Sequence, residues 1–115
     1  MSDRDATWLA DILIAARHVQ RFISGVSGPD ELDADVMRRS AVIHQMLILG
    51  EATKRVSAEF RQQHPEIPWA SMAGMRDVLI HQYRGIDIEQ VWAAATEAVP
   101  DLTRNLEPLI PPLDG

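Results

Sequence analysis

The chain contains no cysteine, and this absence excludes disulfide bridges and thiolate metal sites. No apolar run approaches the roughly 20 residues that a membrane-spanning helix needs. The amino terminus, Met1–Asp5, lacks the basic region with which a secretion signal begins. Together these absences favour a cytosolic protein with no part in the membrane.

An excess of positive charge is also missing. The 17 acidic residues outnumber the 11 lysines and arginines, so the formal net charge is −6. Proteins that bind nucleic acids over a broad surface are usually basic. Any contact with a nucleic acid must therefore be local, through a few arginines, or be formed by assembly with another chain.

Motifs that would bind a cofactor or a metal ion, or form a catalytic triad, are absent as well. The sequence has no glycine-rich phosphate loop and no Ser-His-Asp arrangement. Its histidines His18, His44 and His64 do not share metal-ligand spacing with carboxylates, and we expect them at the surface or in an interface. We therefore expect neither a cofactor nor a metal ion.

What the sequence does contain is helical periodicity along nearly all of its 115 residues. This length fits a single domain, residues 1–115, with a sizeable core. A first apolar stripe predicts a helix that ends near Ser24-Gly25; it comprises Trp8, Ile12, Ala16, Val19 and Ile23. A second, longer helix is predicted from about Asp30 or Asp33 to about Gln63.

Prolines and a cap residue divide the second half of the chain. Pro65 and Pro68 end the second helix, and a third is predicted from Pro68 or Trp69 to about Gln82-Tyr83. Asp87 is a suitable cap for a fourth helix, which Pro100 should bend or split. The prediction is an all-α protein, an antiparallel bundle of four and at most five helices.

The third helix carries an arginine where its apolar stripe predicts a hydrophobic residue. That stripe is Trp69, Ala73, Arg76, Ile80 and Tyr83. A buried guanidinium is costly unless it is paired. A structural arginine bonded to Glu51, to Asp77 or to helix-end carbonyls is the commonest explanation. Glu51 lies between Gly50 and Ala52, whose small size would let the third helix approach.

His81 and Tyr83 make a functional interpretation more attractive, because arginine can stabilise a phosphate and histidine can transfer protons near neutral pH. On an ideal helix, however, His81 lies roughly 140° around from Arg76. Either the helix distorts near its end, or two copies of it complete one site. Asp77, four residues before His81, could orient the imidazole.

These residues resemble the signature of the HepT-like toxins of the HEPN superfamily. The spacing Arg76-x-x-x-x-His81-x-Tyr83 carries the resemblance. Four further segments match the appearance of that family: Leu49-Gly50-Glu51-Ala52, Ile67-Pro68-Trp69, Gly74-Met75-Arg76-Asp77 and Tyr83-Arg84-Gly85-Ile86-Asp87. The resemblance covers almost the whole chain.

The resemblance implies a homodimeric ribonuclease toxin of a type VII toxin–antitoxin system. Arg76 would stabilise charge on the scissile phosphate, and His81 would act as acid or base. The RNA's own 2′-hydroxyl would attack, so no metal ion is required. Asp77 and Glu51 would support the site. A partner nucleotidyltransferase, the antitoxin, would add AMP to Tyr83 and so block RNA.

Two alternatives are also consistent with the sequence. A non-catalytic helical module that binds a nucleotide or the partner nucleotidyltransferase fits the acidic net charge better. A purely structural dimeric bundle would use Arg76 and Asp77 as a buried pair, but it does not explain His81 and Tyr83.

Overall fold

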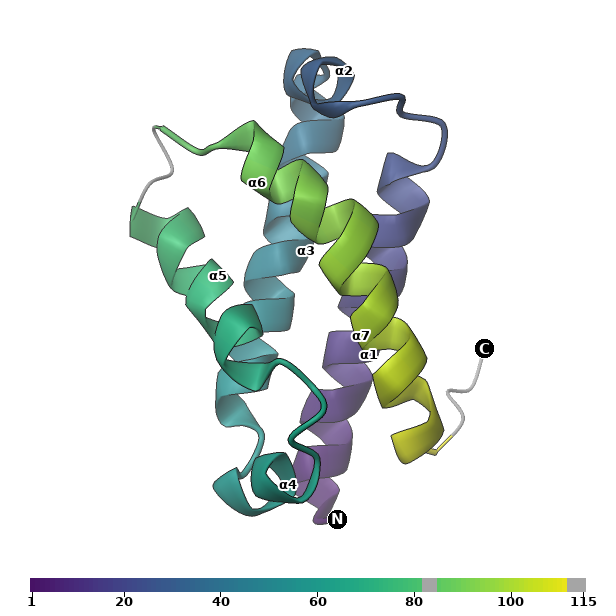
Figure 1. Cartoon of the computed structure of the whole chain (residues 1–115), viewed down its shortest axis with the longest axis vertical. Coiled ribbons are helices and arrows are strands. Elements are labelled where there is room, and N and C mark those ends of the chain that lie inside the picture. The colour runs from purple at the N-terminus through teal and green to yellow at the C-terminus, as the bar shows by residue number, and fades with distance from the viewer. Residues whose placement is uncertain (82–84, 112–115) are drawn as a thin grey trace.

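The computed structural model describes residues 1–81 and 85–111, and every regular element in these two ranges is a helix (Figure 1). Of His81 only the backbone is described. Four helical runs are long: α1 (Asp3–Ile23), α3 (Val36–Arg55), α5 (Trp69–His81), and α6 (Ile88–Ala93) continued by η1 (Ala94–Ala98) and α7 (Val99–Leu106). Three elements are short: α2 (Pro29–Ala34), α4 (Ala58–Gln63) and η2 (Glu107–Leu109). The predicted all-α class is confirmed.

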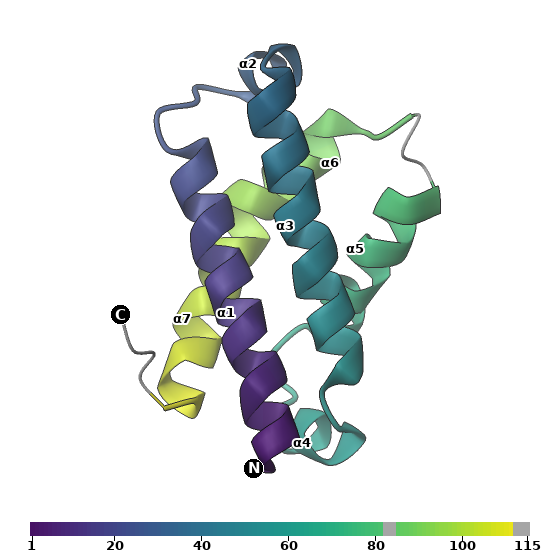
Figure 2. The same ribbon diagram turned by 180° about the vertical axis from the view of Figure 1, so that it is seen from behind.

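The long helices form an antiparallel bundle. Helices α1 and α3 lie side by side, α5 packs along α3, and the run from α6 to α7 crosses this pair and contacts α1 (Figures 1 and 2). The short helices α2 and α4 close the two ends, where the chain turns between long helices. The molecule measures 41 × 31 × 20 Å, and its shortest axis corresponds to two layers of helix.

The core lies between α1, α3 and α7 and is almost wholly aliphatic. The largest side chains with essentially no exposure are Leu9, Ile12, Leu13, Leu32, Met46, Ile67, Leu102 and Leu106. In α1 the predicted stripe faces this core, with Ile12, Ala16 and Val19 fully buried. The predicted end of this helix is also confirmed, because Ser24 follows its last residue and Gly25 has a positive φ of 82°.

The prediction of one continuous second helix up to Gln63 is wrong. The backbone leaves the helical conformation at Asp35, whose side chain accepts a hydrogen bond from the Arg38 N–H at 3.0 Å and caps α3. It leaves it again at Val56 and Ser57, and the Ser57 hydroxyl caps α4 by accepting from the Phe60 N–H at 3.1 Å. Aspartate and serine side chains can bond backbone N–H groups and so start a new helix. Asp35 and Ser57 do this here, although the spacing of apolar residues is helical across both breaks.

The predicted apolar stripe of the third helix is partly wrong. The buried side chains of α5 are Trp69, Met72 and Leu79, whereas Ile80 is 42% exposed. The buried side of α5 therefore follows steps of three and four residues from Trp69 through Met72 and Arg76 to Leu79, and Ile80 is not part of it. Of these residues, Arg76 lies against Gly50 of α3. The predicted end of this helix at Gln82-Tyr83 lies outside the described residues.

The fourth helix begins as predicted, because the Asp87 carboxylate accepts hydrogen bonds from the N–H groups of Glu89 and Gln90 at 3.0 and 3.4 Å. Pro100 disturbs it without dividing it. The preceding segment Ala94–Ala98 is a π-helical turn, in which the Val99 N–H reaches back five residues to the Ala94 carbonyl. Proline supplies no N–H to an α-helical ladder, and a wider turn before it absorbs the mismatch.

Candidate functional site

Arg76 is brought to α3 by an unusually close approach of the two helices at Gly50. A Cβ atom built on Gly50 would lie 2.3 Å from the Cβ of Arg76 and 3.2 Å from its Cα, so no larger residue fits there without a shift of α5. The approach places the Arg76 Nε 3.1 Å from Glu51 Oε2. The predicted pairing of Arg76 with Glu51, made possible by a small neighbour, is confirmed.

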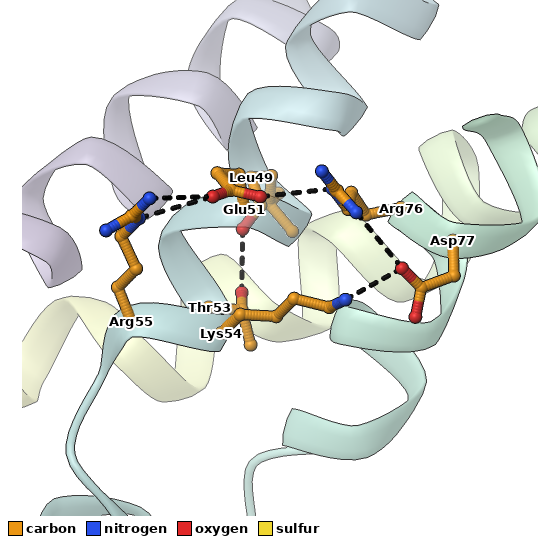
Figure 3. Close-up of polar contacts among 7 residues, drawn as sticks. All are labelled: Leu49, Glu51, Thr53, Lys54, Arg55, Arg76 and Asp77. Carbon is orange, nitrogen blue, oxygen red and sulfur yellow. Dashed lines mark hydrogen bonds and ion pairs between the residues drawn. The ribbon is translucent and has the colours of Figure 1, made fainter.

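The ion pair is the centre of an alternating chain of charges across α3 and α5 (Figure 3). Asp77 Oδ1 accepts hydrogen bonds from Arg76 Nη1 at 3.2 Å and from Lys54 Nζ at 2.7 Å. At the other end, Arg55 lies 3.1 Å from Glu51 Oε1. Three cations against two carboxylates leave this cluster, which we call the Arg76 network, with a net positive charge inside an acidic chain.

The Arg76 network contributes little to the stability of the fold. The side chains of Arg76, Glu51 and Asp77 are 31%, 40% and 46% exposed. Ion pairs with this exposure contribute only about 0–1 kcal/mol each. Arg76 and Asp77 are therefore not the buried pair of the purely structural alternative, and the main effect of the contacts is to hold the guanidinium in place.

Asp77 remains a carboxylate within this cluster. The hydrogen bond from the Lys54 ammonium lowers the pKa of Asp77 below its usual range, and Arg76 contributes further. The carboxylate that was predicted to orient His81 is thus already bonded to two cations. The side chain of His81 and all of Tyr83 lie outside the described residues, so their predicted roles stay predictions.

Lys54 and Arg55 complete the network, although no site role was predicted for either of them from the sequence. Arg55 follows Glu51 by four residues, a helical ion-pair spacing that could have been recognised. Its guanidinium also lies 5.2 Å from the ring centroid of Trp8 on α1. The pair of Lys54 and Asp77 spans two helices and has no local signal.

The other predicted features divide between structure and surface. The Nδ1 of His18 donates a hydrogen bond to Gln45 Oε1 at 3.2 Å, and the imidazole stacks on Phe22, which is a packing role. Within the described part of the chain, no group of three acidic, histidine or cysteine side chains is arranged to hold a metal ion. None of the helices there is both long and apolar enough to cross a membrane.

These observations define a class of protein: a small antiparallel helical bundle in which an arginine is held between two helices. The chain belongs to the Ribonuclease HepT-like family, whose model matches residues 12–109. The resemblance inferred from the motif is thereby confirmed, including its extent along the chain.

Relatives of similar length support this assignment. A Thermococcus cleftensis protein named "Probable ribonuclease HepT" is 39% identical over 102 residues, which cover 89% of this chain and 92% of that protein. A Methanocaldococcus jannaschii protein whose name proposes an RNase is 38% identical over 108 residues, 93% of this chain and 98% of its own. A Caldanaerobacter subterraneus protein with a similar name is 32% identical over 103 residues, 90% and 91% of the two chains. No solved structure matches the chain.

Proposed function

We propose that this protein is an endoribonuclease that cleaves RNA without a metal ion and acts as the toxin of a type VII toxin–antitoxin system. The observation that carries the proposal is the Arg76 network. It is a locally positive site in a chain of net charge −6, and it holds one guanidinium at a helix contact. Family membership and the names of the relatives point to the same activity.

Arg76 would bind the scissile phosphate and stabilise the charge that develops on it. Its guanidinium is already fixed by Glu51 and Asp77, so little reorganisation is needed when the phosphate arrives. The RNA's 2′-hydroxyl would lose its proton and attack the neighbouring phosphorus. The bond to the 5′-oxygen then breaks, that oxygen takes a proton, and a 2′,3′-cyclic phosphate and a 5′-hydroxyl result. His81 would serve as acid or base in these proton transfers.

A homodimer would complete the site. Arg76 and His81 diverge by roughly 140° on an ideal helix, so a single α5 does not aim both side chains at one phosphate. A two-fold axis beside α5 would place the Arg76 of one copy near the His81 of the other. Each dimer would then hold two composite sites.

The proposal predicts that substitutions of the two motif residues abolish cleavage while the fold is retained. Arg76→Lys keeps the charge but loses the planar fork that binds phosphate, and His81→Ala removes the proton donor and acceptor. We expect either change to lower the cleavage rate about 100-fold or more, measured on labelled RNA in EDTA. An RNA with a 2′-deoxyribose at the cleaved position should resist the wild type.

The control is Arg17→Lys, which alters another surface arginine that is held in an ion pair, with Glu107 at 3.2 Å. It should cleave at the wild-type rate. Circular dichroism should be unchanged for every variant. Wild-type cleavage rates in Arg76→Lys and His81→Ala would contradict the site, and cleavage at the 2′-deoxy position would contradict the mechanism.

Tyr83 is proposed as the regulatory residue. A partner nucleotidyltransferase would transfer AMP from ATP to the tyrosine hydroxyl and release pyrophosphate. The added phosphodiester is negatively charged and bulky, and would obstruct RNA close to His81.

The second candidate function is a non-catalytic module that presents Tyr83 to the nucleotidyltransferase, and the acidic net charge favours it. Mass spectrometry after incubation with that partner and ATP, combined with the cleavage assay, separates the two. AMP on Tyr83 with no cleavage by the unmodified protein would favour the module.

A further inference from the structure

A broad surface hollow lies on the far side of α5 from the Arg76 network. It is an open groove of about 680 Å³ between α5 and the run from α6 to α7. Leu79, Val91 and Ala94 form a buried floor, and Met75 and Val78 line the α5 wall. Its size falls in the range of pockets that bind ligands or partner side chains, about 300–1,000 Å³.

The groove and the Arg76 network occupy opposite faces of one helix. At about 100° per residue, Met75 and Val78 lie on one side of α5 and Arg76, Asp77 and Ile80 on the other, with Leu79 buried between the two sides. Val78 and Ile80 are each 42% exposed, although both are aliphatic. A partner in the groove could therefore bind without covering Arg76.

The rim of the groove is acidic. Asp87, Glu97 and Asp101 line it, and no lysine or arginine of the described ranges does. Arg104 pairs with Asp101 and offsets one of these charges, and Asp87 also caps α6. Among the residues that the structure describes, the remaining charge of the rim is negative, which disfavours RNA and favours a cation.

We infer that this groove is a docking site for a basic amphipathic segment of a different protein. Apolar side chains of the segment would fill the floor, and flanking lysines or arginines would lie against Asp87 and Glu97. A second copy of this chain fits less well. A two-fold contact through the groove would set the same acidic rim against itself.

The test uses a labelled helical peptide of leucine and lysine with its leucines on one face. It is about 20 residues long, because isolated helices of about 12–15 residues are only marginally stable. Fluorescence anisotropy should detect binding to the intact protein, and the counterpart with glutamate in place of lysine should not bind. Val78→Arg should weaken binding of the lysine peptide about tenfold, or ~1.4 kcal/mol. Glu97→Lys should weaken it as well.

Two matched controls make the test specific to the groove. Ile80→Arg introduces the same charge at an equally exposed position on the opposite face of α5, and Glu59→Lys reverses a charge on α4. Both should bind the peptide like the wild type. Circular dichroism and melting temperature confirm that each variant is folded.

Several results would overturn the inference. One is absence of binding to the wild type, and another is an equal loss in Val78→Arg and Ile80→Arg, which would mean nonspecific attraction to an acidic protein. Binding of labelled single-stranded RNA that Val78→Glu weakens and Arg76→Lys leaves unchanged would assign the groove to RNA. A change from dimer to monomer in Val78→Arg alone, measured by analytical ultracentrifugation, would assign it to a second copy. None of these readouts depends on nuclease activity.

Discussion

Buried polar side chains in the described part of the chain lie next to hydrogen-bond partners. No buried side-chain nitrogen or oxygen among the described residues lacks a hydrogen bond. Thr53 donates to the Leu49 carbonyl at 2.7 Å, and Asp5, only 5% exposed, accepts from both the N–H and the hydroxyl of Ser57 at 2.8 and 2.6 Å. Asp5 thereby ties the start of α1 to the junction between α3 and α4.

At this scale we predict that Asp5→Asn lowers the free energy of unfolding at pH 7 by about 1–2 kcal/mol, because hydrogen bonds to a charged acceptor are stronger than those to an amide. Burial raises the pKa of Asp5, but the hydrogen bonds from Ser57 and Ser2 outweigh it, and the net pKa is lowered. The contribution of a carboxylate with a lowered pKa is present above its unfolded pKa and is lost as the pH falls through its folded pKa.

The measurement is urea denaturation of wild type and Asp5→Asn from pH 7 down to about pH 3, near the pKa of an unperturbed aspartate. The difference between the two should shrink at the acidic end. Asp11→Asn, on the same helix, serves as the control and should stay close to wild type. A difference that persists undiminished at the acidic end would contradict the role of the charge.

At the scale of the elements, the contact of α3 with α5 positions the site. Gly50 and Glu51 are neighbours on α3 with different roles, because Gly50 admits α5 and Glu51 pairs with the arginine that α5 brings. A glycine inside a helix costs about 1 kcal/mol relative to alanine. Glycine is nevertheless required at this position, because a larger side chain would prevent the close approach of α3 and α5.

We predict that Gly50→Ala destabilises the protein by about 1–3 kcal/mol, the usual cost of overpacking, although alanine is the better helix former. The added methyl would displace Arg76, so RNA cleavage should fall as well if the proposed site is correct. Thermal melting and the cleavage assay measure the two effects.

Gly74→Ala is the matched control, because Gly74 also lies within a helix and a Cβ there meets no atom within 4 Å. It should be neutral or stabilising by up to about 1 kcal/mol. Equal stability of the two variants would show that α3 and α5 are not in close contact at Gly50.

At the scale of the whole molecule, opposite surfaces of α5 differ in charge. The Arg76 network is positive and the groove beside α6 and α7 is acidic, while the chain as a whole carries −6. An anionic substrate is attracted locally and repelled elsewhere, which favours one binding mode. A composite dimer site would concentrate this effect by bringing two such networks together.

A mixing experiment tests the composite site. Inactive Arg76→Ala and His81→Ala proteins, unfolded together and refolded, should recover about a quarter of wild-type cleavage, since half of randomly paired dimers are mixed and each has one intact site. Separate refolding of each variant is the control and should give no activity. If the mixture also stays inactive while exchange is verified by mass, both motif residues act within one chain.

Much of this architecture could be predicted from local patterns. Apolar spacing located α1, Asp87 marked the start of α6, and Gly50 beside Glu51 indicated the close approach to Arg76. The long second helix was predicted wrongly because Asp35 and Ser57 act as caps. A cap changes the backbone over only a few residues, so the helical spacing of apolar residues on both sides does not reveal it. Ile80 was placed in the stripe because several helical faces fit its spacing almost equally well.

The sequence alone determined the helical class, the family signature and the candidate residues Arg76, His81 and Tyr83, because these depend on residue type and spacing along one chain. Only the tertiary structure decided that Lys54 joins Asp77 and that Arg76 faces Glu51 while Val78 faces an acidic groove. The rotation and register of one helix on another depend on the packing of many side chains at once. A contact between α3 and α5 is therefore set by the core beneath them.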